Sequence, residues 1–326
     1  MTAARIDRRT LLRAGTGLGL AMATGPLDVL GVFGGLGRAE AGTTRALRAP
    51  GNGGYGPLKP AGPILDLPEG FRYIRFGDEG SPMEEGRPTP ALHDGMAAFP
   101  GGKGIIRLVR NHEVQERGEA FARPAYDPEA MGGTTTIVFD AKAGRVVRTF
   151  ASLAGTYRNC AGGRTPWGSW LTCEEGTAGP RLGFDRLHGY VFEVPAAADG
   201  PADPFPLRAM GRFVHEAVAV DPATGIVYLT EDDARLPIPG DPSTEVPGES
   251  RSSFLYPYLP EDPRPRPGAL QRGGRLQALA IDERASFNAD LGRTGDRYTA
   301  VWKDVRPEQA HEDALRRGVR PLQPAR

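Results

Sequence analysis

Cysteine is scarce in this sequence, and neither sign of charge is in excess. The 326 residues include two cysteines, and Lys plus Arg number 40, as do Asp plus Glu. This balance, without a basic arm or an aromatic-interleaved basic patch, argues against nucleic acid or anionic lipid as a partner. The sequence also lacks a P-loop, a GxGxxG after a strand, a GxSxG elbow and an HExxH motif. Ser-His-Asp catalysis therefore has no local support.

Glycine and proline are abundant instead. The chain has 45 glycines and 31 prolines, while its 39% apolar content is sufficient for a hydrophobic core. So many turn-forming residues favour short strands and long loops over helices. Two long Pro-rich loops are expected, over residues 195–206 and 237–267. The composition predicts an all-β protein.

The N-terminus has the pattern of an export signal. Arg8 and Arg9 precede a weakly apolar, Gly-rich stretch over residues 14–36, and residues 39–41 (AEA) form a small-x-small cleavage site. A twin-arginine pair ahead of a modest apolar run is typical of the Tat export machinery. An uncleaved anchor is the alternative, but the glycines and Pro26 make a poor spanning helix. We therefore expect export to the periplasm or beyond, without a stable membrane anchor.

The rest of the chain divides into a lead-in and one large domain. Residues 1–41 are the predicted Tat signal peptide, residues 42–62 form a flexible Gly/Pro-rich lead-in, and residues 63–326 form the folded domain. Three β-hairpins are predicted in this domain, over residues 96–109, 135–150 and 217–230.

Two of these hairpins share a turn. Asp140 and Asp221 each open a turn that a glycine closes four residues later. The Asp side chain can bind turn amides, and glycine tolerates a positive φ. The two Asp residues lie about two repeats of ~40 residues apart, the size of a propeller blade. A β-propeller is therefore predicted, with a two-sheet sandwich as the alternative.

Four strand-like runs end on carboxylates. They are residues 108–113 (LVRNHE), 170–175 (WLTCEE), 213–216 (FVHE) and 227–233 (VYLTEDD). Each ending alone is also compatible with a solvated turn, and His215 is more typical of a core residue than of a ligand. Together the endings predict a shared cation site, because oxygen ligands suit Ca²⁺ and a thiolate among them admits iron or zinc.

The roles of the two cysteines stay open on the residues alone. In an exported protein, Cys160 and Cys173 can form a disulfide, or one can be a thiolate ligand and the other a small buried hydrophobe. Arg158 precedes a Gly-rich run, residues 159–163, whose backbone amides can bind an anion or form a tight turn.

Several motifs together resemble the PhoX-type alkaline phosphatases, over residues 60–305. The motifs follow the Tat-like signal and include residues 110–113 (RNHE), 159–175 (NCAGGRTPWGSWLTCEE), 211–232 (GRFVHEAVAVDPATGIVYLTED) and 253–260 (SFLYPYLP). The resemblance implies a six-bladed β-propeller with an iron–calcium cluster at its axis. It also implies hydrolysis of phosphate monoesters outside the cytoplasm.

The resemblance assigns a set of site residues. The implied metal ligands are Glu113, Cys173, Glu174, Glu216 and, with weaker support, Asp232. Cys173 is then the thiolate on iron, which argues against a disulfide with Cys160. Arg158 is implied as a catalytic contact to phosphate. Fe³⁺ and Ca²⁺ together neutralise charge on the phosphate and hold the nucleophile.

One departure from the family pattern affects the expected activity. Family members continue beyond the strand that contains Trp302 into a GAxxFxRxEG-type segment, which supplies a substrate-binding Arg and a metal-binding Glu. This segment is not found here. Either the sequence is truncated at its C-terminal end or this family member lacks those parts. For the chain as given we therefore expect an incomplete propeller, with one or two blades missing, and little or no phosphatase activity. We also expect a monomer. Alternatives are a calcium-dependent hydrolase of another ester and a non-catalytic calcium-binding propeller.

Overall fold

The computed structural model describes residues 55–84, 86–232, 253–281 and 295–310. The predicted signal peptide, residues 1–41, lies outside these ranges. The described chain is built from β-strands, and its helical parts are 3₁₀ turns of three or four residues. These turns are η2 (Pro180–Leu182), η3 (Arg208–Met210), η5 (Ala269–Arg272) and η7 (Pro307–Gln309). The all-β prediction is confirmed.

The strands form three antiparallel sheets and one small hairpin, β1 (Lys59–Pro60) with β2 (Asp66–Leu67). The first sheet contains β3 (His93–Gly102), β4 (Ile105–His112), β5 (Gly132–Asp140) and β6 (Arg145–Thr156). The second contains β7 (Asn159–Arg164), β8 (Ser169–Glu174) and β9 (Val191–Pro195). The third contains β10 (His215–Val220), β11 (Val227–Glu231), β12 (Leu255–Pro260), β13 (Gly274–Ile281) and β14 (Ala300–Asp304).

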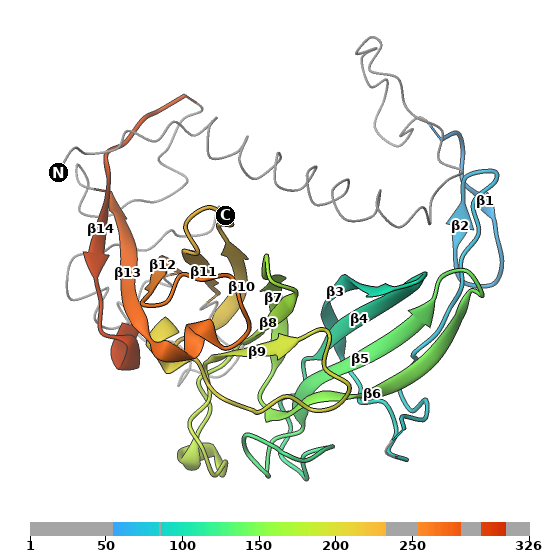
Figure 1. Ribbon diagram of the computed structural model, residues 1–326, viewed down its shortest axis with the longest axis horizontal. Helices are drawn as coiled ribbons and strands as arrows, with labels where there is room; N and C mark the ends of the chain where they lie inside the picture. Colours follow the sequence, from blue (N-terminus) through green and yellow to red (C-terminus); the bar gives the residue numbers. More distant parts are fainter. Residues whose placement is uncertain (1–54, 85, 233–252, 282–294, 311–326) are drawn as a thin grey trace, which may run out of the picture.

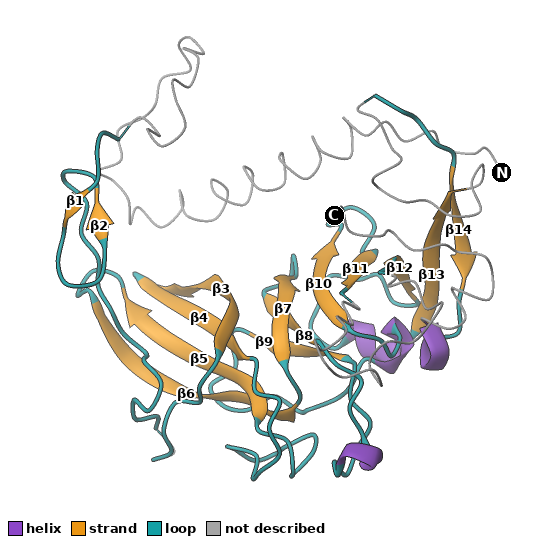
Figure 2. Ribbon diagram, turned by 180° about the vertical axis from the view of Figure 1, so that it is seen from behind, coloured by secondary structure: helices purple, strands orange, loops and turns teal. Residues whose placement is uncertain are grey.

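The three sheets are arranged like propeller blades. Within each sheet the strands follow the order of the chain, and the first strands of successive sheets, β3, β7 and β10, pack against one another. Figures 1 and 2 show the sheets fanning out from these inner strands along an open arc. The described residues thus form three blades. The sequence led us to expect more, because a six-bladed propeller lacking one or two blades would have four or five.

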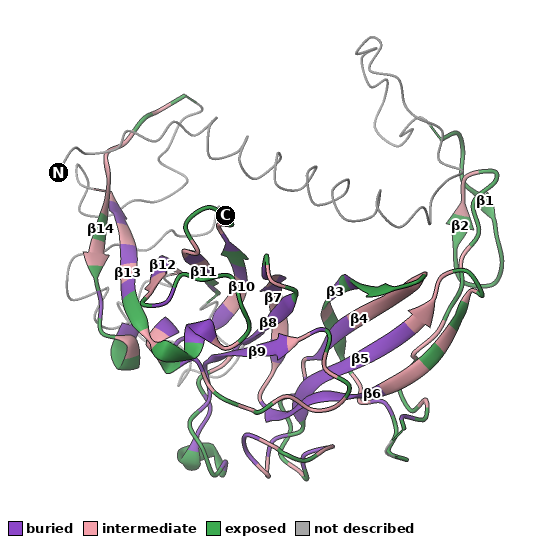
Figure 3. Ribbon diagram, in the orientation of Figure 1, coloured by how far each residue is buried: buried purple, intermediate pink, exposed green. Residues whose placement is uncertain are grey.

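The core lies between neighbouring blades. The largest apolar cluster joins the second blade to the third and includes Leu171, Phe213 and Tyr256, all nearly inaccessible to solvent. A second cluster, with Val109 and Phe192, joins the first blade to the second. Figure 3 shows this burial along the middle strands. Because each buried large apolar side chain contributes roughly 1.5–3 kcal/mol, these clusters fix the blades relative to one another.

The predicted Asp-to-Gly turns are confirmed in detail. The Oδ1 atom of Asp140 accepts hydrogen bonds from the backbone N–H groups of residues 142 and 143, each at 2.9 Å. Asp221 accepts from the N–H of Ala223 and from the hydroxyl of Thr224. The glycines that close the two turns have φ values of 65° and 73°. The turns therefore set the register of the β5–β6 and β10–β11 hairpins.

Replacing Gly225 with alanine should destabilise the third blade. Its φ is +73°, and an added Cβ would lie 2.9 Å from the carbonyl oxygen of Pro263. We expect a loss of roughly 1–3 kcal/mol in the free energy of unfolding, measured by urea denaturation. Gly200→Ala is the control, because a Cβ there meets no heavy atom within 4 Å. Equal stability of the two variants would contradict the strain argument.

Candidate metal centre

The candidate site lies at one edge of the three blades, where their first two strands meet. At this edge the paired residues are His93 with His112, Asn159 with Glu174, and His215 with Glu231. In each hairpin, the residue that follows the pair on each strand carries a carboxylate or a thiol. These six residues are Asp94 and Glu113, Cys160 and Glu175, and Glu216 and Asp232. The same arrangement therefore occurs in all three blades.

A β-bulge recurs at the same place in each inner strand. The register shifts between His93 and Met96 in β3, between Asn159 and Gly162 in β7, and between His215 and Val218 in β10. In each case two residues face one on the partner strand, and the first of the two is Asp94, Cys160 or Glu216. Bulges re-aim side chains beside functional sites. Here they bring three donors from three blades together.

The donor atoms of this cluster lie close to one another. Ligand atoms of Asp94, Glu113 and Cys160 are all within 4.8 Å of each other, as are those of Cys160, Glu175 and Glu216. The thiol of Cys160 belongs to both groups and lies 3.5 Å from Oε2 of Glu216. Cys160 is therefore the centre of the cluster.

Arg158 lies beside the cluster and pairs with two of its carboxylates. Its Nε lies 3.0 Å from Oε1 of Glu113, and its Nη2 lies 3.1 Å from Oε2 of Glu175. Its backbone is in the left-handed region, with φ of 48°. The N–H of Arg158 donates to the carbonyl of Val114, and its carbonyl accepts from the N–H of Glu175. These bonds hold the strained backbone and aim the guanidinium at the carboxylates.

The electrostatics of the cluster disfavour its anionic forms. Burial, with the neighbouring carboxylates Glu113 and Glu216, raises the pKa of Glu175 to about 7, despite the opposing charge of Arg158. Burial, then Asp232 and other carboxylates, raises the pKa of Glu216. Burial and the charges of Glu175 and Glu216 also raise the pKa of the Cys160 thiol. A bound cation reverses such shifts, because it favours deprotonated ligands.

The donor set fits the cations implied by the sequence. Four carboxylates, those of Asp94, Glu113, Glu175 and Glu216, suit a hard cation such as Ca²⁺, and the Cys160 thiolate extends the range to iron. Carboxylates crowded together in a partly buried site are costly without a counter-charge. Arg158 supplies only part of that charge.

The structure does not bring all the predicted residues together. It places Glu113, Glu216 and Arg158 in the cluster. Cys173 instead has no solvent exposure and packs in the core between the second and third blades. Both cysteines are free, so the disulfide alternative is not found.

Glu174 is also directed away from the cluster. It is fully buried, and its carboxylate accepts hydrogen bonds from the N–H groups of Tyr157, Gly189 and Tyr190. Nδ1 of His188 lies 2.7 Å from the same carboxylate. These four donors use the acceptor sites of the Glu174 carboxylate, so a cation would have to displace one of them. In our interpretation Cys160 and Glu175 have the roles that the family resemblance assigned to Cys173 and Glu174.

The remaining predicted residues have clear positions. Glu231 is buried and accepts hydrogen bonds from the N–H of Phe254 and the hydroxyl of Tyr256. Asp232, which follows it, is exposed and close enough to raise the pKa of Glu216. His215 is a core residue, as the sequence suggested: burial lowers its pKa to about 3. The Gly-rich run after Arg158 forms strand β7 rather than an anion-binding loop.

The ligand set implied by the family resemblance left out three members of the cluster: Asp94, Cys160 and Glu175. A usable signal was present. Aligning the endings NHE, CEE and TED by their last residue selects Glu113, Glu175 and Asp232, the residues that share the edge. Likewise, Asp94 and Glu216 each follow a histidine at the start of an inner strand. Reading the three hairpins in one common frame would have found two of the three.

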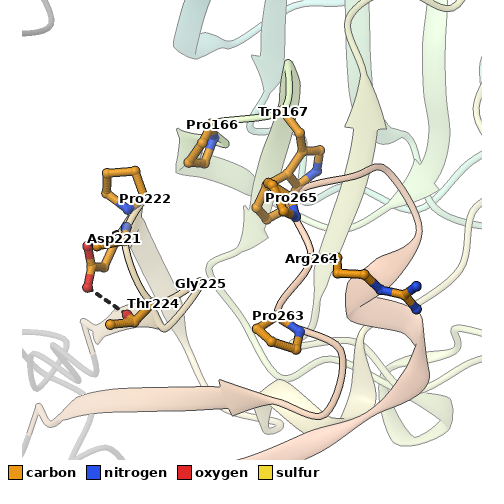
Figure 4. A pocket seen from close by; sticks show the side chains of 10 residues that line it. Pro166, Trp167, Asp221, Pro222, Thr224, Gly225, Pro263, Arg264 and Pro265 are labelled. Atoms are coloured by element: carbon orange, nitrogen blue, oxygen red, sulfur yellow. Dashed lines mark hydrogen bonds between the residues drawn. The ribbon is translucent and has the colours of Figure 1, made fainter.

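A cavity of about 320 Å³ lies at turns of the second and third blades, away from the cluster. Figure 4 shows Trp167 and the prolines of three separate turns around it. The polar side chains that line it bind within their own segments: Asp221 accepts from Thr224, and Arg264 donates to Asp262. We assign no function to this cavity.

Blades whose inner edges converge on carboxylates, a thiol and an arginine define an all-β protein with a candidate cation site. The chain belongs to the alkaline phosphatase PhoX family, whose profile matches residues 53–318. A similar solved structure is that of Pseudomonas fluorescens PhoX in complex with vanadate, a transition state analogue. It is 18% identical over 75% of this chain and 57% of that chain, with a TM-score of 0.43. No curated protein matches the sequence.

Proposed function

We propose that the protein is a metal-dependent phosphatase acting on small phosphate monoesters. The observation that carries this proposal is the cluster around Cys160, with Arg158 at its side, in a chain of this family. The match covers only 57% of the Pseudomonas fluorescens chain. The activity of the present protein is therefore proposed from its own residues and is not carried over from that relative.

We assign the cations as Fe³⁺ and Ca²⁺. Cys160, Glu175 and Glu216 would hold the iron, because they include the thiolate, and Asp94 and Glu113 would contribute oxygens for calcium. When bound, the cations supply positive charge that neutralises the phosphate and its developing negative charge. Asp232, exposed at the same edge, is available as a further oxygen donor.

Arg158 would bind the substrate phosphate. Its guanidinium is held at the rim of the cluster by Glu113 and Glu175, and its side chain keeps 38% exposure. If the carboxylates of Glu113 and Glu175 rotate to bind the cations, the N–H groups of Arg158 become free to donate to two phosphate oxygens. The fixed backbone of Arg158 keeps the guanidinium oriented during that exchange.

Metal analysis and hydrolysis of p-nitrophenyl phosphate test the proposal. Protein reconstituted with Fe³⁺ and Ca²⁺ should retain both metals and release phosphate, and chelation should abolish the reaction. Glu216→Gln should lose metal and at least about 10-fold in rate, whereas Asp203→Asn, an exposed carboxylate after β9, should change neither.

Other outcomes of this assay identify the alternatives. Since the sequence leads us to expect slow turnover, vanadate binding by calorimetry accompanies the rate measurement. Calcium without iron, and no binding of vanadate, would instead support a non-catalytic calcium-binding protein. Hydrolysis of carboxylic esters but not phosphate esters would support the other-ester alternative.

We also propose export by the Tat machinery and a periplasmic or extracellular location for the monomer. The support is the twin-arginine pattern of residues 1–41 together with family membership. None of the described residues forms a helix long and apolar enough to cross a membrane. Replacing Arg8 and Arg9 with lysine should keep the precursor in the cytoplasm, as fractionation would show.

A further inference from the structure

The bulge in β7 removes two residues from the regular pairing of their sheet. Cys160 and Ala161 together face a single residue of β8, Cys173. Buried backbone carbonyls at such a position need another hydrogen-bond donor. The side chain of Asn111, on β4 of the preceding blade, provides it. Its Nδ2 donates to the carbonyl oxygens of Cys160 and Ala161, both at 2.7 Å.

The other half of the Asn111 amide binds the same neighbouring blade. Its Oδ1 accepts hydrogen bonds from Nε1 of Trp170 at 2.9 Å and from the hydroxyl of Thr172 at 2.8 Å. Asn111 is fully buried. Two donors and two acceptor positions are therefore all used, and the network fixes which way the amide faces. Asn111 thus holds both β7 and β8.

Gly95 confines the bulge from a second side. A Cβ at this position would lie 2.8 Å from the carbonyl oxygen of Cys160 and 2.9 Å from Cα of Ala161. Only glycine lets β3 approach β7 so closely. The carbonyl of Cys160 is therefore held between the backbone of Gly95 and the amide of Asn111, both from the first blade.

The bulge in the third blade is held in a different way. Thr230 faces the bulge of β10, and its hydroxyl lies 3.1 Å from the N–H and 3.3 Å from the carbonyl of Ala217. That bulge is held from within its own blade. The β7 bulge is held across blades, so Asn111 also sets where Cys160 lies relative to Asp94 and Glu113.

We propose that Asn111 is a positioning residue for the Cys160 thiol, fixing the bulge that places it between the carboxylates of two blades. The inference rests on the proposed function only in taking Cys160 as a metal ligand. Loss of the Asn111 donors would let the bulge relax and move the thiol away from its partners, weakening thiolate coordination without removing any ligand.

Titration with Cd²⁺ tests the proposal, because thiolate coordination gives a ligand-to-metal charge-transfer absorption. Asn111→Asp preserves shape and the acceptor for Trp170 and Thr172 but turns an oxygen toward the two carbonyls. We expect at least about a 10-fold loss of Cd²⁺ affinity and a weaker band. Trp170→Phe is the matched control, since it disturbs the same amide but keeps both donors to the bulge. Cys160→Ala gives the zero of the band.

Retention of wild-type affinity and band by Asn111→Asp would overturn the proposal. The proposal would also be overturned if the losses of Cd²⁺ affinity in Asn111→Asp and Trp170→Phe were simply proportional to their losses in the free energy of unfolding. If Asn111→Asp does not fold, Gly95→Ala decides, since it displaces the same bulge while leaving Asn111 intact: an unchanged band overturns the proposal, and a weakened band supports it. The readout needs no turnover, so a protein that binds Cd²⁺ through Cys160 but neither hydrolyses phosphate esters nor binds vanadate contradicts the proposed function alone.

Discussion

Replacing Cys160 with alanine should abolish iron binding and phosphate release, whereas replacing Cys173 should leave both intact. The thiol of Cys160 lies near two groups of carboxylates, while Cys173 is fully buried in an apolar cluster. We expect Cys160→Ala to lower turnover at least about 100-fold, because the thiolate is the soft ligand of the set. Iron content by elemental analysis and hydrolysis of p-nitrophenyl phosphate provide the measurements.

Cys173→Ala is the internal control for that experiment. It removes one buried sulfur from the core, so we expect a loss of about 1 kcal/mol in the free energy of unfolding and little change in rate. Cys160→Ala should have the smaller effect on stability, because its thiol lies among carboxylates rather than in the core. The opposite result, with iron lost from Cys173→Ala only, would support the ligand assignment that the family resemblance implied.

The hairpins were predictable because their signals are local. The Asp side chains that bind turn amides and the glycines with positive φ act within five residues, so the pattern alone locates the turns at residues 140–144 and 221–225. The grouping of carboxylates at one edge was predictable for a similar reason: adjacent strands of a hairpin share an edge. Glu113 and Glu216 both lie in the candidate cluster. The expected strand ending at Glu216 is wrong, however, because Glu216 lies at the start of β10.

The identity of the other ligands depends on single-residue register. Side chains alternate along a strand, so a shift of one residue exchanges the buried face for the site. In residues 172–175 (TCEE), the register decides whether Glu174 or Glu175 faces the site. The presence of two adjacent carboxylates does not reveal which of them does. The bulges add a second shift, which directs Cys160 toward the carboxylates while Cys173 enters the core. A bulge depends on contacts such as that with Asn111, which sequence spacing does not reveal.

The adjacent residues Glu174 and Glu175 should respond in opposite ways to the same substitution. Glu174→Gln places an amide N–H₂ among four donors and leaves His188 facing Asp127, both fully buried. Burial lowers the pKa of His188, but the Glu174 carboxylate, followed by Asp127, raises it above its ordinary value. Loss of the Glu174 charge therefore removes the main stabilisation of the buried imidazolium. We expect a cost on the order of 3 kcal/mol, measured by urea unfolding of metal-free protein.

Glu175→Gln should instead remove metal affinity with little loss of stability. Its pKa is raised from the ordinary 4.5 to about 7, so the folded state holds more protons than the unfolded state between these values. Glu175 therefore contributes a loss of stability to the metal-free protein as pH rises from 4.5 to about 7, and Glu175→Gln should remove that contribution. Unfolding curves across this range, with metal content for both variants, distinguish the roles. A stable Glu174→Gln protein without metal would show that Glu174, and not Glu175, is the ligand.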